Sequence, residues 1–236
     1  MNRFKRTSLL LGLLAVAGTA HAQFSATITA TSDYDFRGVS LSAKDPALQA
    51  SLDYAFGETG FYVGAWGSNI DYGDDVDGDI EVDLYAGYDG AINDDTGWTV
   101  GLTWYTYPGS SNSATRSKIE AYPEAWLGIN YKGLDLKQWY AFEYDGTNDA
   151  LYTEANYTFE LPQNFSLSLH AGYNYGDAFE DFEYFDYSVA VGYELGNFGL
   201  ELKYTGTDLS GDDKVTDDVF NTEGRLVFSV STTLPW

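Results

Sequence analysis

The chain has 236 residues, no cysteine and a formal net charge of −24 at neutral pH. The lack of cysteine excludes a disulfide framework and thiolate chemistry. The acidic excess makes nucleic acid and anionic membrane surfaces poor partners, because both bind patches of Lys and Arg. An acidic chain can be disordered, but an aromatic content of 17% argues against that here. Many aromatic residues, 25 glycines and Asp-rich breaks favour strands and turns over helices.

The first 22 residues have the organisation of a secretory signal peptide. Three basic residues lie within the first six positions, an apolar run follows over residues 9–16, and Ala20-His21-Ala22 ends the segment. The apolar run is too short to span a membrane as a helix. We expect cleavage after Ala22 and one mature domain over residues 23–236. Its net charge would be 9 − 36 = −27, because the three N-terminal basic residues are lost.

Apolar and polar residues alternate with a period of two along most of the mature sequence. This period predicts β-strands that each have one apolar and one polar face. The first such segment alternates over fourteen residues, from Phe24 to Arg37. Twelve strands are predicted, over residues 24–37, 46–56, 61–72, 79–88, 98–104, 125–131, 134–144, 151–159, 165–175, 187–195, 198–204 and 223–236.

The last segment indicates how the sheet ends. Its apolar face includes Leu226, Phe228, Val230 and Leu234 and finishes at the aromatic residue Trp236. A long apolar edge strand is an aggregation hazard, so we expect it to pair with the first mature strand and close a barrel. An aromatic C-terminal residue preceded by apolar alternation also resembles the assembly signal of bacterial outer-membrane barrels. Phe228 and Trp236 are therefore expected to engage the barrel assembly machinery.

The breaks between the predicted strands alternate in length. Those after even-numbered strands are mostly tight, as at Lys132-Gly133 and Gly196-Asn197, and only residues 89–97 make a longer one. Those after odd-numbered strands are longer and richer in Asp, Gly and Ser. An even number of strands with short turns at one end and long loops at the other is typical of outer-membrane barrels of Gram-negative bacteria. Both termini then lie at the short-turn, periplasmic end.

Aromatic residues of the apolar face gather near the two ends of the strands. Such rings form interfacial girdles in membrane barrels, which indicates that the apolar face contacts outer-membrane lipid and lipopolysaccharide. The alternative is a soluble sandwich or lipocalin-like barrel with these rings in its core. The turn-end ring would comprise Phe24, Phe56, Tyr88, Trp98, Tyr131, Phe165, Phe198 and Trp236, and the loop-end ring Tyr34, Phe36, Tyr72, Trp104, Tyr144, Tyr173 and Tyr204.

Four segments of the N-terminal half resemble the TorF family of porins. They are Ser32-Asp33-Tyr34-x-Phe36-Arg37-Gly38-Val39-Ser40, Gly60-Phe61-Tyr62-Val63-Gly64-x-Trp66-x-Ser68-Asn69, Glu81-x-Asp83-x-Tyr85-x-Gly87-Tyr88 and Tyr105-x-Tyr107-Pro108-Gly109. Beyond Glu124 the similarity is one of barrel patterning. The resemblance implies a membrane barrel and supplies no catalytic residue. It supports the predicted fold more strongly than it supports the identity of any transported solute.

If the apolar face meets lipid, the opposite face lines a lumen that is rich in carboxylates. Such a lumen attracts cations and repels anions, because low-dielectric walls concentrate the field. The alternative is that many acids pair with bases or lie at the rims. Arg37, beside Asp33 and Asp35, is expected to form an internal ion-pair cluster. The acids of this face would be Asp33, Asp35, Asp53, Asp79, Glu81, Asp83, Asp135, Glu143, Glu154, Glu194, Glu201 and Glu223, and the bases Arg37, Lys137, Lys203 and Arg225.

Two other kinds of site were weighed against the pore. His170 shares the lumen face with Ser166 and Ser168, as a barrel hydrolase would require, but no oxyanion donor can be named. A histidine satisfied by lumen partners is the simpler interpretation. The acidic loop 74–79 fails as an EF-hand, because Gly73 and Leu84 stand where ligands are needed. No cofactor or metal site is predicted.

The sequence therefore predicts an all-β, transmembrane, antiparallel up-and-down barrel of about twelve strands. The expected function is passive diffusion of small solutes, cationic or neutral, through a carboxylate-lined lumen. A plugged structural or adhesive barrel that acts through acidic extracellular loops is the main alternative, and a hydrolase that uses His170 is the third. Twelve strands lie between side-chain-filled small barrels and water-filled large porins, so strand number alone does not fix the width of a pore.

Overall fold

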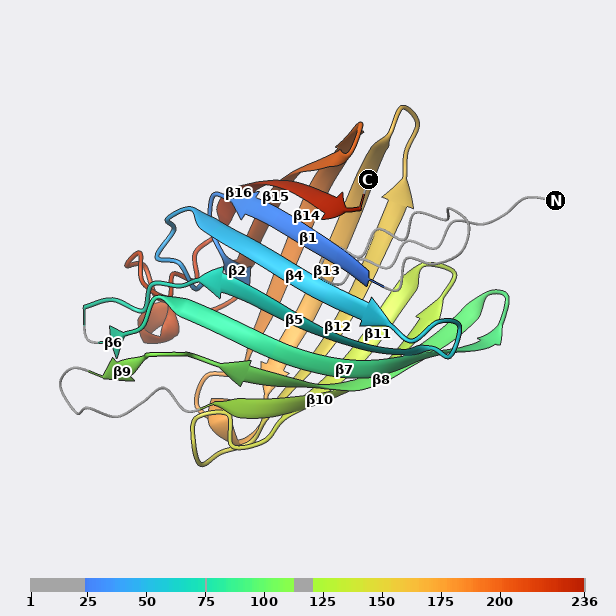
Figure 1. Cartoon of the computed structure of the whole chain (residues 1–236). Helices are drawn as coiled ribbons and strands as arrows, with labels where there is room; N and C mark the ends of the chain where they lie inside the picture. The colour runs from blue at the N-terminus through green and yellow to red at the C-terminus, as the bar shows by residue number, and fades with distance from the viewer. Residues whose placement is uncertain (1–23, 75, 113–120, 236) are drawn as a thin grey trace.

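The computed structural model describes residues 24–74, 76–112 and 121–235. Twelve long strands form one closed, antiparallel barrel in which neighbours in sequence are neighbours in space (Figure 1), as predicted. Within the described residues no helix is long and apolar enough to cross a membrane. The barrel strands are β1 (Phe24–Thr31), β4 (Ala47–Ala55), β5 (Phe61–Asn69), β7 (Ile80–Asn93), β8 (Thr96–Thr106), β10 (Tyr122–Tyr131), β11 (Leu134–Ala141), β12 (Ala150–Glu160), β13 (Phe165–Tyr175), β14 (Tyr184–Leu195), β15 (Phe198–Thr207) and β16 (Arg225–Leu234).

The barrel closes where the predicted first and last strands meet. β1 and β16 pair in antiparallel register from Ala26 opposite Leu234 to Thr31 opposite Ser229. Neither of these strands is therefore left with an open edge, which removes the aggregation hazard of a terminal strand. The predicted signal peptide, residues 1–22, and the C-terminal Trp236 lie outside the described residues.

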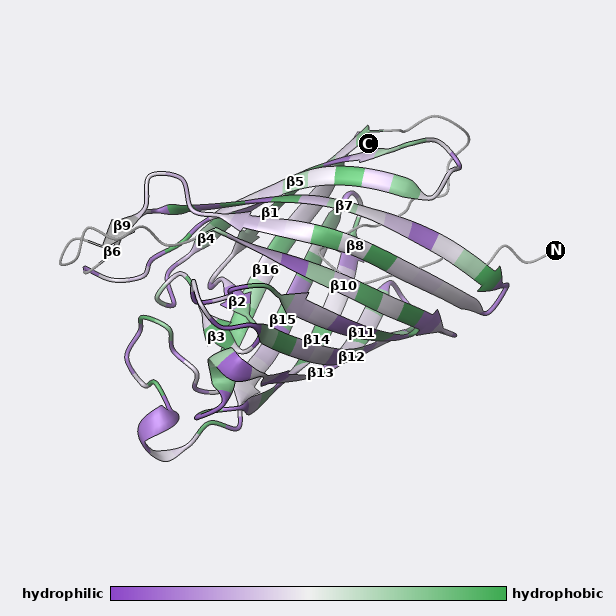
Figure 2. Cartoon of the chain, turned by 90° about the horizontal axis from the view of Figure 1, so that it is seen from below, coloured by the Kyte–Doolittle hydropathy of each residue, from purple (hydrophilic) through white to green (hydrophobic). Residues whose placement is uncertain are grey.

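The apolar side chains of the barrel strands point outward and the polar ones inward. On β7, Ile80 and Leu84 are 51% and 55% exposed, whereas Glu81 and Asp83 between them are 2% and 6% exposed. Successive side chains of a strand point to opposite faces of the sheet, so one alternation produces both surfaces. Bands of hydrophobic and hydrophilic colour follow one another along β8 and β10 (Figure 2). A contiguous apolar outer surface of this kind marks contact with a membrane or a partner.

Short turns and long loops lie at opposite ends of the barrel, as the breaks in the sequence predicted. The turn between β10 and β11 is Lys132-Gly133, whose φ angles of 50° and 89° match a two-residue hairpin turn. The long break predicted at residues 89–97 is wrong. β7 continues to Asn93 through a register irregularity after Ala91, and β8 begins at Thr96. All the connections at this end are therefore short.

The predicted fourteen-residue first strand is also wrong in its second half. β1 ends at Thr31, and residues 32–41 fold back into the barrel as a small hairpin, here called the lumen hairpin. Its strands, β2 (Asp35–Phe36) and β3 (Val39–Ser40), pair across a turn formed by Arg37 and Gly38. Those two residues have φ angles of 50° and 82°, which is the backbone of a type I′ turn. The remaining short elements are β6 (Val76–Asp77), β9 (Ser111–Asn112) and the 3-10 turns η1 (Asp177–Phe179) and η2 (Gly211–Asp213).

Part of the predicted loop-end girdle lies inside the barrel instead. Tyr34 is 7% exposed, and its ring centre lies 5.3 Å from that of Trp66. Phe36 and Tyr72 pack against the same cluster as Tyr34, and Tyr144 packs against a second cluster. For these rings, burial against neighbouring side chains outweighs a place at the membrane interface. Two aromatic-rich clusters thus fill the loop end of the barrel. Their buried members are Tyr34, Leu41, Ala47, Trp66 and Ile70 in one, and Tyr105, Tyr122, Ala141, Ala150, Phe179 and Tyr184 in the other.

Candidate functional site

The lumen hairpin reaches from one wall of the barrel to the opposite wall. It follows β1, and the tip residue Arg37 meets side chains of β10, β11 and β12. In the closed order of strands β11 is six places from β1 in either direction, so these are the strands farthest from β1. The hairpin therefore crosses the interior of the barrel.

The legs of the hairpin are fixed by hydrogen bonds within its own segment. Asp33 Oδ1 accepts from the hydroxyl of Ser40 at 2.6 Å and from that of Ser42 at 3.1 Å. The backbone N–H of Tyr34 donates to Ser42 Oγ at 2.8 Å, and the N–H of Leu41 donates to the carbonyl of Tyr34 at 2.7 Å. Buried polar groups satisfied in this way hold a segment in one conformation.

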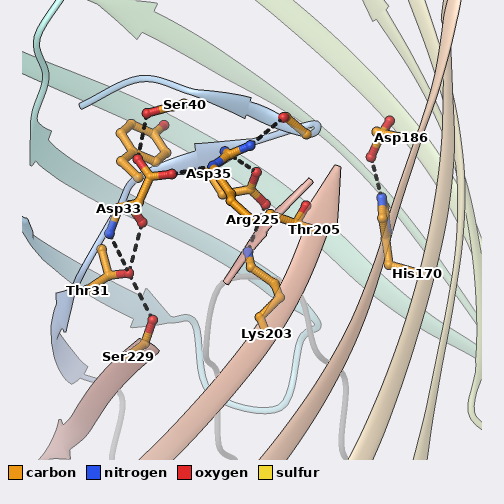
Figure 3. A network of polar contacts seen from close by, with 12 residues as sticks. Thr31, Asp33, Asp35, Ser40, His170, Asp186, Lys203, Thr205, Arg225 and Ser229 are labelled. Atoms are coloured by element: carbon orange, nitrogen blue, oxygen red, sulfur yellow. Dashed lines mark hydrogen bonds and ion pairs between the residues drawn. The ribbon is translucent and has the colours of Figure 1, made fainter. Parts of the chain in front are cut away.

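Four charged side chains join the base of the hairpin to β15 and β16 (Figure 3). Arg225 donates from Nε to Asp33 at 2.5 Å, from Nη2 to Asp35 at 2.6 Å, and from Nη1 to the carbonyl of Gly38 at 2.7 Å. Lys203 donates to the second oxygen of Asp35 at 2.9 Å. Two carboxylates thus face two bases, and this group, here called the hairpin base cluster, is balanced in charge. The sequence predicted that Arg37 would pair with Asp33 and Asp35; that pairing is wrong, because Arg225 occupies both.

At the tip, Arg37 forms an ion pair with Glu124, an acid that was not among the predicted lumen residues. Its Nη2 donates to Glu124 Oε1 at 2.7 Å, and the hydroxyl of Tyr105 donates to Glu124 Oε2 at 2.9 Å. The guanidinium carbon lies 4.0 Å from the ring centre of Tyr152 and 4.7 Å from that of Phe36. Stacking on two rings adds to the ion pair, because the faces of aromatic rings attract cations.

Two further carboxylates lie near this tip, and within residues 24–74, 76–112 and 121–235 no base forms an ion pair with either. Glu81 and Asp83 follow one another on the inner face of β7, and in the barrel Asp83 stands opposite Tyr105 of β8. Glu81 Oε1 accepts from the hydroxyl of Tyr107 at 3.4 Å. Glu81 Oε2 and Asp83 Oδ1 are buried, and neither has a hydrogen-bond partner among the described residues. With Glu124, they make a region of three carboxylates and one guanidinium, here called the acidic wall.

The other predicted lumen acids divide between the interior and the loops. Asp53 points inward and accepts from Tyr85 and, at 3.0 Å, from Ser51. Glu154 also points inward, where the Trp139 indole N–H donates to it at 2.8 Å. Glu143 does not line the lumen. β11 ends at Ala141, and Glu143 is exposed in the following loop with a φ of 49°.

Two more predicted lumen acids are loop residues, and two interior acids were missed. Asp79 is exposed before β7 begins, and Glu223 pairs with Lys214 on the loop side at 3.0 Å. Glu124 and Asp186 are each 1% exposed inside the barrel. The alternation of β10 and β14 could have identified both, because each sits on the polar face opposite the apolar residues of its strand.

His170 belongs to a buried polar group rather than to a serine pair. Its Nε2 lies 2.7 Å from Asp186 and 3.0 Å from the hydroxyl of Tyr152, and its Nδ1 lies 2.6 Å from Asn156 Oδ1. Ser168, which a hydrolase could have used, instead shares a hydrogen bond with the Thr158 hydroxyl. The contacts of this histidine are those of a satisfied lumen residue, and they join β12, β13 and β14 across the inner face.

A cavity of about 390 Å³ opens beside the lumen hairpin toward the loops. Arg37 and Glu81 line it, together with Asn174 and Asp145. Most of the remaining wall is aromatic. The cavity thus joins the acidic wall to the loop end of the barrel.

The loop that carries Asp145 is held by that carboxylate. Asp145 accepts from the backbone N–H groups of Thr147 and Asn148, at 3.0 and 2.7 Å, and from their side chains. These hydrogen bonds, with that of the Asn148 backbone the largest cause, lower the pKa of Asp145 to about 2. The carboxylate is therefore ionised at every ordinary pH at the entrance of the cavity.

Three residues predicted for the girdles or for assembly lie on the outer surface. Trp98 and Trp104, near the two ends of β8, are 36% and 45% exposed, and Phe228 on β16 is 49% exposed. Their places fit the aromatic rings expected at the two interfaces. Among the described residues, no group of three or more His, Cys, Asp or Glu side chains is placed to hold a metal ion.

A family profile described as "Bacterial protein of unknown function (Gcw_chp)" matches residues 15–234, and the chain belongs to this family. No curated relative matches the sequence. The fold is that of outer-membrane porin barrels.

Three solved structures of this fold illustrate the likeness. The KdgM porin has a TM-score of 0.54 at 11% identity, over 90% of this chain and 99% of that one. The NanC porin has a TM-score of 0.57 at 8% identity, over 89% and 100%. The outer membrane protein Omp33 of Acinetobacter baumannii has a TM-score of 0.51 at 8% identity, over 91% and 98%. At these identities the likeness concerns the fold.

Proposed function

We propose that this protein is a porin of the Gram-negative outer membrane that lets small cationic or neutral solutes diffuse passively. The observation that carries the proposal is the closed barrel with an apolar outer face and an acidic inner face. Export with cleavage after Ala22, contact with lipid and lipopolysaccharide, and insertion through the assembly machinery by the C-terminal strand belong to the same proposal. Protein isolated from outer membranes should then begin at Gln23.

We place the narrowest part of the path beside the lumen hairpin, because the hairpin crosses the interior from one wall to the other. There the hairpin base cluster is neutral, whereas the acidic wall has three carboxylates for one guanidinium. A cation that passes this point replaces part of its hydration by carboxylate oxygens, while an anion is repelled.

The resemblance of the sequence to the TorF family of porins remains a prediction and agrees with this function. The hairpin itself contains the first motif of that resemblance.

A plugged structural or adhesive barrel is the second candidate. It is favoured by the same hairpin, which crosses to the opposite wall, and by the aromatic clusters that fill the loop end. A hydrolase that uses His170 has less support, because both ring nitrogens contact Asn156, Asp186 and Tyr152. The channel and the plugged barrel differ in one measurable property, which is ion conduction.

The test is the reversal potential of the purified barrel in a planar bilayer under a potassium chloride gradient. The wild type should show cation selectivity, and the double variant Glu81→Gln, Asp83→Asn should show less, since two carboxylates leave the narrow region. The preference should weaken at high salt, where the screening length falls to ~3 Å at 1 M.

The matched control is the double variant Glu58→Gln, Asp94→Asn, which removes the same charges from exposed turns at the other end of the barrel. Its reversal potential should equal that of the wild type. A bilayer that stays closed with folded protein present would favour the plugged barrel. Anion selectivity would contradict the role given to the acidic wall.

A further inference from the structure

The cavity beside the lumen hairpin has the walls of a binding site. The aromatic side chains that line it are Phe36, Tyr72, Tyr107, Tyr122, Tyr144, Tyr184 and Phe220. They come from the hairpin, from two strands and from four loops, and they pack against one another, with ring centres 5.0 Å apart for Tyr122 and Tyr144. Mutual packing fixes these rings, so the cavity is preformed, as ligand sites usually are.

The charges around the cavity select the sign of an occupant. Glu81 and Asp145 line it, and Arg37 is its one basic lining residue among those described. Arg37 is already paired with Glu124, so it offers little to an anion. Glu81 is 2% exposed, and its Oε2 is buried with no hydrogen-bond partner in the part of the chain that the structure describes. A buried, unpartnered carboxylate oxygen is stabilised by a cation or by a donor, and an anion would be repelled.

The same features separate an organic cation from a metal ion. Ca²⁺ takes six to eight oxygen ligands, whereas only two carboxylates of the described residues line this cavity. The two oxygens of the Asp145 carboxylate already accept hydrogen bonds from Thr147 and Asn148. Aromatic faces, in contrast, attract weakly hydrated ammonium groups, and cages of such rings recognise methylated ammonium ions. A volume of about 390 Å³ is enough for a small molecule of this kind.

We propose that the cavity is a binding site for small organic ammonium ions, held between the tyrosine rings and Glu81 on the loop side of the constriction. The ammonium group lies against the ring faces and toward the Glu81 carboxylate, and Arg37 stays on Glu124. One part of this inference rests on the proposed function, namely that the bound ion is a solute that then enters the pore. Binding itself requires the folded barrel but does not require that the barrel conducts ions.

The test is isothermal titration of the folded mature protein in detergent with tetramethylammonium chloride. Neopentyl alcohol, an uncharged molecule of similar shape that has one added hydroxyl group, is the ligand control. We expect saturable binding of tetramethylammonium and none of the alcohol. Glu81→Gln should weaken binding about tenfold, which corresponds to about 1.4 kcal/mol. Tyr72→Leu should weaken it also, because one ring face is lost.

Asp53→Asn is the matched protein control, since Asp53 is an inward carboxylate that does not line the cavity. It should bind tetramethylammonium as the wild type does. Each variant is first checked on a denaturing gel, where a folded barrel migrates differently before and after boiling. Binding is compared only among variants that pass this check. Equal binding of the alcohol, or unchanged binding by Glu81→Gln, would overturn the proposal.

The two proposals fail in different ways. A cation-selective channel that does not bind tetramethylammonium would refute the site and leave the porin intact. A barrel that binds tetramethylammonium but does not conduct would refute the channel and keep the site.

Discussion

The hairpin base cluster and the acidic wall are two charged regions inside one barrel, and they are built differently. In the first, Asp33 and Asp35 meet Arg225 and Lys203, and the guanidinium also donates to the hairpin backbone. In the second, Arg37 pairs with Glu124, whereas Glu81 Oε2 and Asp83 Oδ1 have no hydrogen-bond partner among the described residues. Both lie near the loop end, on opposite sides of the lumen hairpin.

The difference separates a structural role from a functional one. Removal of one partner from a balanced buried ion pair leaves an uncompensated charge, which is strongly destabilising. A region that already contains uncompensated carboxylates costs folding energy, so loss of one of them should not reduce stability. The base cluster therefore fixes the hairpin, and the acidic wall is the part available for interaction with a cation.

The largest effect is expected when the balanced cluster is broken. Arg225→Gln leaves Asp33 and Asp35 buried with Lys203 alone, and it should lower the free energy of unfolding by about 3–5 kcal/mol. Denaturant unfolding of the barrel in lipid vesicles measures this change. Lys214→Gln is the control, because that ion pair with Glu223 is exposed and should contribute about 0–1 kcal/mol. Equal stability of the two variants would contradict the structural role given to the hairpin base cluster.

A smaller effect is expected at the tip of the hairpin. Arg37→Asn removes the contact with Glu124, and Asn tolerates the positive φ of this turn position. Stability should fall by about 3 kcal/mol, the lower end for a broken buried ion pair, because Arg37 pairs with one carboxylate whereas Arg225 pairs with two. Single-channel conductance should rise, because the hairpin loses its ion pair to the opposite wall.

The control for the tip is Lys44→Asn, in the same connection. Lys44 also has a positive φ, and its ion pair with Asp218 is exposed, so conductance and stability should not change. A conductance of Arg37→Asn equal to that of the wild type would mean that the tip does not limit the path.

The smallest effect is expected in the loop beside the acidic wall. The pKa of Asp145 is lowered to about 2 in the folded protein, below the ordinary value near 3.9. The ionised carboxylate of Asp145 therefore stabilises the loop fully above pH 4, and this stabilisation is lost as the pH falls through about 2. Carbon-13 shifts of the carboxyl group and amide exchange of Asn148 should follow that titration. In Asp145→Asn the exchange of Asn148 should show no such step, and a step near pH 4 in the wild type would contradict the assignment.

The barrel itself followed from the alternation in the sequence. The inward and outward faces of β7, for example, could be assigned because Glu81 and Asp83 alternate with Ile80 and Leu84. Closure by β1 and β16 followed from the need to pair a terminal strand. Turn lengths could be assigned to the two ends, except at residues 89–97, where a register irregularity hides the continuation of β7.

The lumen hairpin shows where that reasoning failed. Residues 32–37 continue the alternation of β1, so the local pattern favours one long strand. Arg37 and Gly38 adopt a two-residue turn, and Asp33 and Asp35 are drawn to Arg225, which lies 190 residues from Asp35 in the sequence. An alternation describes which face a side chain takes, but it contains no information on partners so distant in the chain.

The sequence by itself determined the number of strands, the two faces of the barrel and the excess of acid inside it, because these depend on the short-range period of a β-strand. The tertiary structure alone decided that the first strand stops at Thr31, that Arg37 pairs with Glu124, and that Tyr34, Tyr72 and Tyr144 turn inward. The physical reason is desolvation. Charges and aromatic rings enclosed by a barrel must find partners there, and closure of the barrel determines which ones are within reach.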